Sequence, residues 1–336
     1  MELYSYGWDA QWAEALASNG PGLTAGRVVM ASYGLCRLWT MKGLCEASLS
    51  GALLRAPASE RPVTGDWVAL EPDTCRIRAV LPRRKSLSRK KAGREYEEQM
   101  IAANLDVLLA VLGLDGDFHP RRLERYLLLG QQSGAEIVVV LNKSDVCPDA
   151  LDRVRQVGRL TGAPVVLMSA VNAESVHQLH RYVEPGQTAA LAGSSGVGKS
   201  TIVNALLGAS RQETLAVREH DSRGRHATTA RELFLLPQGW LLLDMPGMRE
   251  LEVWTAPEEV GRSFRDIAEW SSECRFRDCK HAGEPGCAVA RAVEEGALDS
   301  ARLENFHKLH RETDRQKLKR EQRIAQRAYR SFLKNR

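Results

Sequence analysis

The chain has 336 residues, which is too long for one ordinary hydrophobic core and predicts two or three domains. Hydrophobic residues make up 43% of the chain and charged residues 26%, and no run of eighteen apolar residues occurs. This composition excludes a membrane-spanning protein and is typical of a soluble, globular one. The net charge of +5 is unevenly distributed, because residues 301–336 contain twelve Lys/Arg and four Asp/Glu, a net charge of +8. A basic arm therefore follows a slightly acidic body.

The first ninety residues or so contain short β-rich segments separated by Gly/Pro turns, a pattern that predicts a small five-stranded β barrel. The predicted strands are residues 26–30, 35–40, 51–55, 66–70 and 75–80. A basic cluster follows, in which no acid interrupts seven cations: Arg83, Arg84, Lys85, Arg89, Lys90, Lys91 and Arg94. Two interpretations of this cluster stay open, a solvated linker or a surface that a phosphate backbone crosses.

From residue 103 onward, apolar strands alternate with helices such as residues 120–133 and 151–160, which indicates a parallel sheet with helices on both faces. The β-branched run of residues 137–141 is typical of a central parallel strand. Loops at the carboxyl ends of such strands bind ligands in α/β folds. The polar segment that follows this strand is therefore a candidate ligand-binding loop, with the residues Asn142, Lys143, Ser144 and Asp145.

This segment is suited to guanine. The carboxylate of Asp145 can accept hydrogen bonds from both N1 and N2 of guanine, whereas adenine offers no such pair of donors. Lys143 is expected to lie over the base, and Asn142 to tie the loop to the phosphate loop described next. After the apolar run of residues 165–168, Ser169 and Ala170 match a small loop that supports the guanine carbonyl.

A phosphate-binding loop with the pattern G-x-x-x-x-G-K-[ST] lies between a short predicted strand, residues 188–192, and a predicted helix, residues 201–207. Its glycines let the backbone curl so that N–H groups point at phosphate oxygens. Lys199 is expected to bind the β and γ phosphates, and the Ser200 hydroxyl to ligate Mg²⁺. The residues expected to contact GTP here are Gly193, Ser194, Ser195, Gly196, Val197, Gly198, Lys199, Ser200 and Thr201.

Asp244 ends another apolar run and is expected to hold Mg²⁺ through water, while the Gly247 N–H contacts the γ phosphate. The position after this glycine usually carries a glutamine that orients the attacking water, but Met248 occupies it here. Either hydrolysis is very slow or another side chain substitutes.

His226 is the candidate substitute, since its segment lies between the phosphate loop and Asp244, where the first switch of a GTPase belongs. Its imidazole could orient the attacking water, and the alternative is a loop histidine with no catalytic part. Thr228 or Thr229 would supply a hydroxyl to Mg²⁺ and a backbone N–H to the γ phosphate.

A cysteine/histidine cluster predicts a metal site. Its spacing is C-x4-C-x-H-x5-C, three thiolates and one imidazole within fourteen residues. Four N/S ligands make a closed tetrahedral Zn²⁺ site, with no open position for a catalytic water, so we expect one structural zinc per chain. Disulfides are disfavoured because the chain has no secretory signal and a cytosol keeps thiols reduced. The predicted ligands are Cys274, Cys279, His281 and Cys287.

The basic arm is expected to form one long helix with Leu303, Phe306, Leu309 and His310 on one face. Charge runs are often solvated helix faces. A basic helix beside a zinc site favours contact with RNA.

The motifs stand in an unusual order, since the guanine segment precedes the phosphate loop by some fifty residues, whereas ordinary GTPases have the reverse order. This order, the G-x-H-x-T-T switch segment and the metal cluster resemble the circularly permuted GTPase family that depends on the small ribosomal subunit, known as RsgA or YjeQ. The resemblance extends over nearly the whole chain and is most specific from residue 103 to 289. One departure is Ala227, where the family has the first of three threonines. The choice between Thr228 and Thr229 as the Mg²⁺ ligand therefore stays open.

The resemblance implies a multidomain α/β protein: an OB-fold β barrel at residues 1–95, a circularly permuted P-loop GTPase domain at 96–255, and a zinc-binding helical domain with a basic helix at 256–336. It implies a cytoplasmic monomer, without a membrane partner, that binds the 30S ribosomal subunit and its 16S rRNA. Hydrolysis of GTP to GDP during late maturation of this subunit would time the release of the factor.

Two alternatives stay open. The first is an RNA-binding assembly factor whose nucleotide site senses GDP or alarmone levels without productive turnover, which Met248 favours and the intact Lys199 and Ser200 weaken. The second is a stand-alone signalling GTPase with a protein partner, against which the basic arm argues.

Overall fold

The N-terminal part of the chain is a closed five-stranded barrel with an OB fold. The computed structural model describes residues 2–32, 34–90, 98–116, 118–208, 231–245, 261 and 264–334. Barrel strands follow the order β1-β2-β3-β5-β4, in which β3 pairs parallel with β5 and the other pairs are antiparallel. They are β1 (Thr24–Ser32), β2 (Leu35–Thr40), β3 (Gly43–Leu49), β4 (Trp67–Glu71) and β5 (Arg76–Val80).

The barrel also contains short helices, and one of them corrects a predicted strand. Residues 51–55 form helix α2 (Gly51–Arg55), and the third strand is β3 instead. Ser50 caps this helix, because its hydroxyl accepts a hydrogen bond from the Leu53 N–H at 3.4 Å, and Ala-Leu-Leu-Arg favours helix once such a cap is present. The other helical segments here are η1 (Leu3–Tyr6), α1 (Ala10–Ala17) and η2 (Ala58–Glu60).

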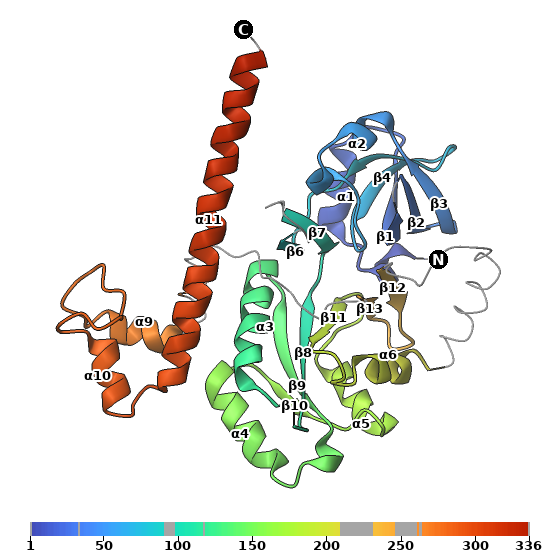
Figure 1. The fold of residues 1–336 in the computed structure, drawn as a ribbon. Helices are drawn as coiled ribbons and strands as arrows, with labels where there is room; N and C mark the ends of the chain where they lie inside the picture. The colour runs from blue at the N-terminus through green and yellow to red at the C-terminus, as the bar shows by residue number, and fades with distance from the viewer. Residues whose placement is uncertain are drawn as a thin grey trace.

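A six-stranded sheet forms the second part of the molecule (Figure 1). The strand order is β10-β9-β8-β11-β13-β12, and only β12 runs antiparallel to its neighbour. The two central strands β8 and β11 are buried along their whole length, as continuous apolar runs require. The strands are β8 (Val107–Gly113), β9 (Glu136–Asn142), β10 (Val165–Leu167), β11 (Thr188–Gly193), β12 (Glu232–Leu235) and β13 (Leu241–Asp244).

Helices cover both faces of this sheet. On one face α3 (Pro120–Ser133) and α4 (Ala150–Thr161) pack against β8 and β9. On the other face α5 (Ala173–His177), the short turn η4 (Gln178–Arg181) and α6 (Lys199–Leu207) pack against β8, β9 and β11. The predicted parallel sheet between two helical layers is confirmed.

Buried charges join the barrel to the sheet. The guanidinium of Arg27 on β1 donates to the Thr188 hydroxyl on β11 at 3.1 Å, and burial lowers the pKa of this arginine to about 10. A two-stranded ribbon, β6 (Ser86–Lys90) and β7 (Glu98–Ala103), lies at the same junction. The two parts are therefore held by specific polar contacts rather than by a free linker.

The basic cluster predicted at residues 83–94 begins with three cations that have partners inside the chain. Arg83 pairs with the fully buried Asp66 at 2.8 Å, and Lys85 pairs with Asp106 at 3.1 Å. Arg84 pairs with Asp9 and lies 4.0 Å from the ring centre of Trp12. The solvated linker is therefore wrong for these three residues, which attach the strands of the junction to their neighbours, while the crossing of a phosphate backbone at this cluster stays a prediction.

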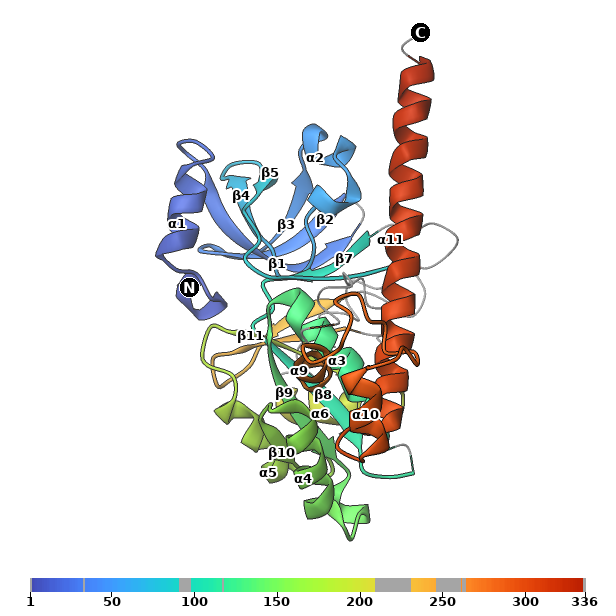
Figure 2. The same cartoon turned by 90° about the vertical axis from the view of Figure 1, so that its left-hand side faces the viewer.

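The C-terminal part consists of α9 (Arg265–Ser271), α10 (Ala288–Glu294) and the 35-residue helix α11 (Ser300–Lys334). The predicted long basic helix is confirmed, and it projects past the barrel (Figures 1 and 2). Its first turns share a core with α9, α10 and Leu128 of α3. Among the described residues, no helix combines the length and apolar character needed to cross a bilayer.

Arg302 of α11 joins three helices. It pairs with Glu124 of α3 at 2.7 Å and donates two hydrogen bonds to Asp266 of α9. The side chains of Arg302 and Glu124 are 11% and 3% exposed, and Asn305 donates a second hydrogen bond to Glu124. These contacts attach the C-terminal part to the sheet.

We predict that Arg302→Met destabilises this attachment by about 3–5 kcal/mol, because it leaves the buried Glu124 carboxylate without its cation. The control is Arg125→Met, which removes a half-exposed pair with Glu312 and should cost less than about 1 kcal/mol. Hydrogen–deuterium exchange of peptides from α9 and α10 measures the change. Equal protection in both variants would contradict the prediction.

Candidate nucleotide-binding and metal sites

The phosphate loop lies between the end of β11 at Gly193 and the start of α6 at Lys199. Gly196 and Gly198 have φ angles of +80° and +96°, which favour glycine, and a Cβ atom on Gly198 would collide with the amide nitrogen of Asn142. Lys199 donates to the carbonyl oxygens of Gly193 and Ser194 at 2.7 and 2.6 Å, so its ammonium group lies inside the loop. The N-terminus of α6 faces the same space, with Ser195, Ser200 and Thr201 exposed and Val197 buried.

Asn142 connects this loop to two others. Its side-chain NH₂ donates to the Val197 carbonyl oxygen at 2.7 Å, and its side-chain oxygen accepts from the Ala170 N–H at 2.8 Å. Only 1% of Asn142 is exposed. The polar segment after β9, the phosphate loop after β11 and the small loop after β10 therefore lie together at the carboxyl edge of the sheet.

The groups assigned to guanine recognition lie in the same place. The Ser169 hydroxyl donates to the carboxylate of Asp145, and the Ser144 N–H donates to the Met168 carbonyl oxygen at 3.2 Å. Lys143 has a left-handed φ of +67° and forms an ion pair with Asp115. This geometry holds a carboxylate and a lysine side chain beside one another at the edge where β9 and β10 end.

Two residues of the site were not identified from the sequence. Asp115, just beyond β8, holds Lys143, and Arg122 in the first turn of α3 donates to the Ser194 hydroxyl at 3.3 Å. The sequence did contain a signal for Asp115. It is an acid just after the apolar strand β8, and the carboxyl ends of parallel strands lie at the same edge of the sheet. Arg122 had no such signal, since its partner is 72 residues away.

Asp244 ends β13, next to the phosphate-loop strand, and pairs in register with Glu232 of β12. The remaining predicted site residues lie outside the described part of the chain, and their roles stay predictions. They are His226, Thr228, Thr229, Gly247 and the departure at Met248.

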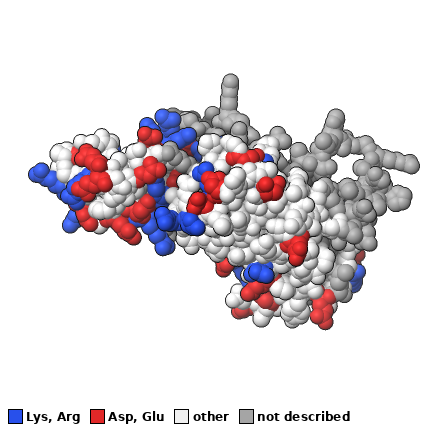
Figure 3. Space-filling view, turned by 90° about the horizontal axis from the view of Figure 1, so that it is seen from below, with Lys and Arg blue, Asp and Glu red and all other residues white. Residues whose placement is uncertain are grey.

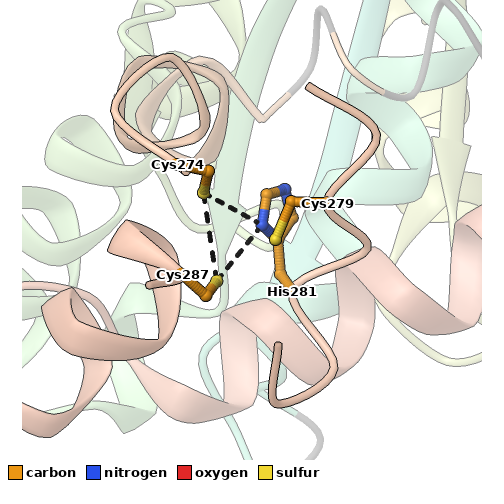
Figure 4. A group of neighbouring side chains, drawn as sticks. All are labelled: Cys274, Cys279, His281 and Cys287. Atoms are coloured by element: carbon orange, nitrogen blue, oxygen red, sulfur yellow. Dashed lines mark hydrogen bonds between the residues drawn. The ribbon is translucent and has the colours of Figure 1, made fainter. Parts of the chain in front are cut away.

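The predicted metal ligands come together in the C-terminal part (Figure 4). The ligand atoms of Cys274, Cys279, His281 and Cys287 all lie within 4.8 Å of one another. The His281 Nδ1 atom is 3.6 and 3.5 Å from the sulfurs of Cys274 and Cys287, and these sulfurs are 4.0 Å apart. A zinc tetrahedron with bonds of about 2.0–2.3 Å has edges of roughly 3.3–3.8 Å, so the two distances from His281 fit it, and the four donors together could hold a metal ion.

Local structure brings these ligands together. Cys274 follows α9, while Cys287 is the N-cap of α10 and accepts from the Ala290 N–H at 3.3 Å. Between them, His281 adopts a left-handed φ of +59° that turns the chain back toward both helices. The cluster therefore ties α9 to α10.

The sheet order, the phosphate loop and the guanine segment that precedes it in sequence define a circularly permuted P-loop GTPase. The family model described as RsgA GTPase matches residues 80–254. The chain belongs to this RsgA GTPase family, and its relatives agree with that placement over almost their whole length.

One relative is a small ribosomal subunit biogenesis GTPase RsgA from Opitutus terrae, 43% identical over 93% of this chain and 90% of its own. Another protein of that name, from Methanosarcina acetivorans, is 40% identical over 98% of this chain and 91% of its own. Among solved structures, YjeQ from Thermotoga maritima matches with a TM-score of 0.66 and 27% identity, covering 87% of this chain and 98% of that one. YloQ, titled a circularly permuted GTPase, matches with a TM-score of 0.62 and 25% identity, covering 87% and 95%.

We predict that Cys287→Ser lowers the bound metal from one equivalent to a small fraction, because a closed four-ligand site loses one of its thiolates. Peptides of α9 and α10 should then exchange faster, since such a metal contributes folding energy locally. Elemental analysis of protein purified without chelators measures the metal. Cys147→Ser is the control, because Cys147 packs beside the sheet, outside the cluster. Absence of metal from the parent protein would contradict the prediction.

Proposed function

We propose that this protein binds GTP at the carboxyl edge of its sheet and hydrolyses it in complex with the 30S ribosomal subunit, during late maturation of that subunit. Hydrolysis would then time release of the protein. The observation that carries this proposal is the junction at Asn142, which joins the guanine and phosphate loops into one site despite their reversed order in the chain. The name shared by its relatives supports the small subunit as the partner.

In this proposal Asp145 recognises the guanine edge, Ser169 and Ala170 border the base, and Lys199 binds the β and γ phosphates. The loop amides from Gly193 to Thr201 surround the phosphates. Mg²⁺, bound by the Ser200 hydroxyl and by Asp244 through water, would neutralise charge that develops on the phosphates. His226 orients the attacking water, Gly247 contacts the γ phosphate, and Thr228 or Thr229 completes the Mg²⁺ shell.

The metal of the C-terminal part is, in this proposal, one structural zinc. Three thiolates and an imidazole leave no open position, so the ion holds α9 and α10 in place and takes no part in hydrolysis. The domain boundaries at residues 95 and 255 belong to the same proposal, as does a monomeric protein in the cytoplasm.

Contact with 16S rRNA is proposed for the C-terminal domain. Seven of the twelve Lys/Arg residues of the basic arm lie in residues 317–334, on the end of α11 that projects from the molecule. Cations on a projecting helix can reach phosphates without a rearrangement of the core.

A nucleotide sensor without productive turnover is the second candidate, and Met248 is the observation that favours it. The position of Lys199 inside the phosphate loop favours hydrolysis instead, because this lysine is the charge that stabilises phosphoryl transfer.

We predict that Asp145→Asn weakens GTP binding by about 1.5–3 kcal/mol, because charge-assisted hydrogen bonds to guanine are lost. Xanthosine triphosphate should bind better to this variant, since its 2-carbonyl accepts from the new amide. Calorimetry with GTP and with xanthosine triphosphate measures how the affinities of the parent and the variant differ. Asp152→Asn, an equal change of charge on the exposed surface of α4, is the control and should bind GTP like the parent. An unchanged affinity of Asp145→Asn for GTP would refute the assignment.

We expect slow hydrolysis by the protein alone and strong stimulation by purified 30S subunits. His226→Ala should lose roughly tenfold or more of the stimulated rate, the contribution of a positioned catalytic group, with little change in nucleotide affinity. His177→Ala, which removes an exposed imidazole from α5, is the control. A multiple-turnover phosphate assay with and without 30S subunits measures both effects. No stimulation of the parent would favour the sensor, and full stimulation of His226→Ala would assign that histidine a structural part only.

A further inference from the structure

A cavity of about 350 Å³ lies between helix α11 and the segment that carries Cys279, Lys280 and His281. Its volume is near the lower end of the roughly 300–1,000 Å³ typical of small-ligand sites, which is enough for one nucleotide. The walls combine rings, cations and one acid rather than aliphatic side chains. The lining residues are Cys279, Lys280, His281, Phe306, His307, His310, Arg311 and Asp314.

Aromatic rings make up one wall of this cavity. The ring of Phe306 is the centre of a cluster, 5.3 Å from the ring of His310 and 5.8 Å from that of His307. His307 Nε2 lies 3.2 Å from the His281 carbonyl oxygen, which holds the His307 ring against the metal cluster. His310 is half-buried, with its side chain 37% exposed, so its ring is both supported by neighbours and accessible from the cavity. Such a ring can stack on a base.

Two cations also line the cavity. Lys280 and Arg311 are both exposed, and within the described residues neither forms an ion pair. Arg311 donates its Nε–H to the His307 carbonyl oxygen at 3.2 Å, which holds the side chain beside the rings. Asp314 lies 3.4 Å from the Nδ1 atom of His310 and would repel a phosphate, which Lys280 and Arg311 attract.

We propose that this cavity binds one unpaired nucleotide of a single-stranded RNA, with the base stacked on His310, whose ring Phe306 supports in a T-shaped contact, and its phosphate on Lys280 and Arg311. The inference rests on the proposed function and deepens it, because it specifies which form of RNA the C-terminal domain selects. A base within a duplex is stacked on its neighbours and cannot enter, so the site distinguishes single strands, loops and ends from helices.

Charge alone does not explain such a site. Figure 3 shows acidic and basic side chains interleaved over the C-terminal domain on the face it presents, so that face is not a uniformly positive surface. The rings of the cavity distinguish a nucleobase from an acidic peptide or an inorganic anion.

The test uses the full-length protein and a fluorescent single-stranded RNA of about six nucleotides, within the span that such grooves usually bind. We expect His310→Ala to weaken binding roughly tenfold, the loss of one base stack, and His310→Phe to retain it. Arg311→Gln should weaken binding and reduce the slope of log affinity against log salt by about 0.7. Lys308→Gln removes the same charge from an exposed position of α11 outside the cavity and should change affinity by less than about twofold. Binding of duplex RNA should be equal in the parent and both His310 variants.

Each other outcome overturns the proposal. Equal losses in Lys308→Gln and Arg311→Gln, or displacement of the RNA by an oligoglutamate at equal charge, would show a charged surface without a base site. Unchanged RNA binding by His310→Ala would show that no base stacks on His310. Free adenosine monophosphate that binds with the same dependence on His310 and as tightly as the RNA would make the cavity a site for free nucleotides.

GTP hydrolysis with and without 30S subunits is measured on the same preparations, and elemental analysis confirms that the variants keep their metal. If 30S subunits fail to stimulate hydrolysis while RNA binding still depends on His310, the proposed function fails and the RNA-binding cavity beside α11 stands. If stimulation occurs and RNA binding does not depend on His310, only the proposal for the RNA-binding cavity fails.

Discussion

The buried amide of Asn142 makes the two hydrogen bonds on which the arrangement of the nucleotide site depends. A buried amide left unpaired costs about 1–3 kcal/mol, so the loops that satisfy it are held to it. Its partners, Val197 and Ala170, come from the phosphate loop and from the loop after β10. A Cβ atom on Gly198 has no space beside this amide, which explains why the loop has glycine at that position. One side chain therefore sets the mutual position of the base and phosphate ends of the site.

This constraint also explains why reversal of the motif order leaves the site intact. The carboxyl ends of parallel strands meet at one edge of a sheet whatever the order in which the chain visits them. Here β11 lies between β8 and β13, although three strands of its sheet precede it in the chain and two follow it. The permutation changes what is attached to the sheet rather than the site. Helix α3 contacts the phosphate loop through Arg122 and the C-terminal domain through Glu124, so a single helix touches both.

Features that are defined by residues close together in the sequence could be predicted. The parallel sheet, the spacing of the metal cluster and the long basic helix are of this kind, and the structure contains all three. The strand predicted at residues 51–55 was wrong because the Ser50 cap outweighed an apolar pattern too short to distinguish strand from helix. Partners far apart in sequence could not be predicted. Arg83 and Arg84 looked like an open basic cluster because nothing local shows that Asp66 and Asp9 fold against them.

The projecting end of α11 is exposed and strongly charged. The last buried residue of this helix, within its described residues, is Thr313, and the apolar Leu318 beyond it is 58% exposed. Seven Lys/Arg residues lie in residues 317–334 of this helix, and their like charges repel one another. Residues such as Lys, Arg, Gln and Ala favour helix in this segment. A polyanion that neutralises these cations would remove the repulsion, so binding of a polyanion and helix formation should reinforce one another along the arm.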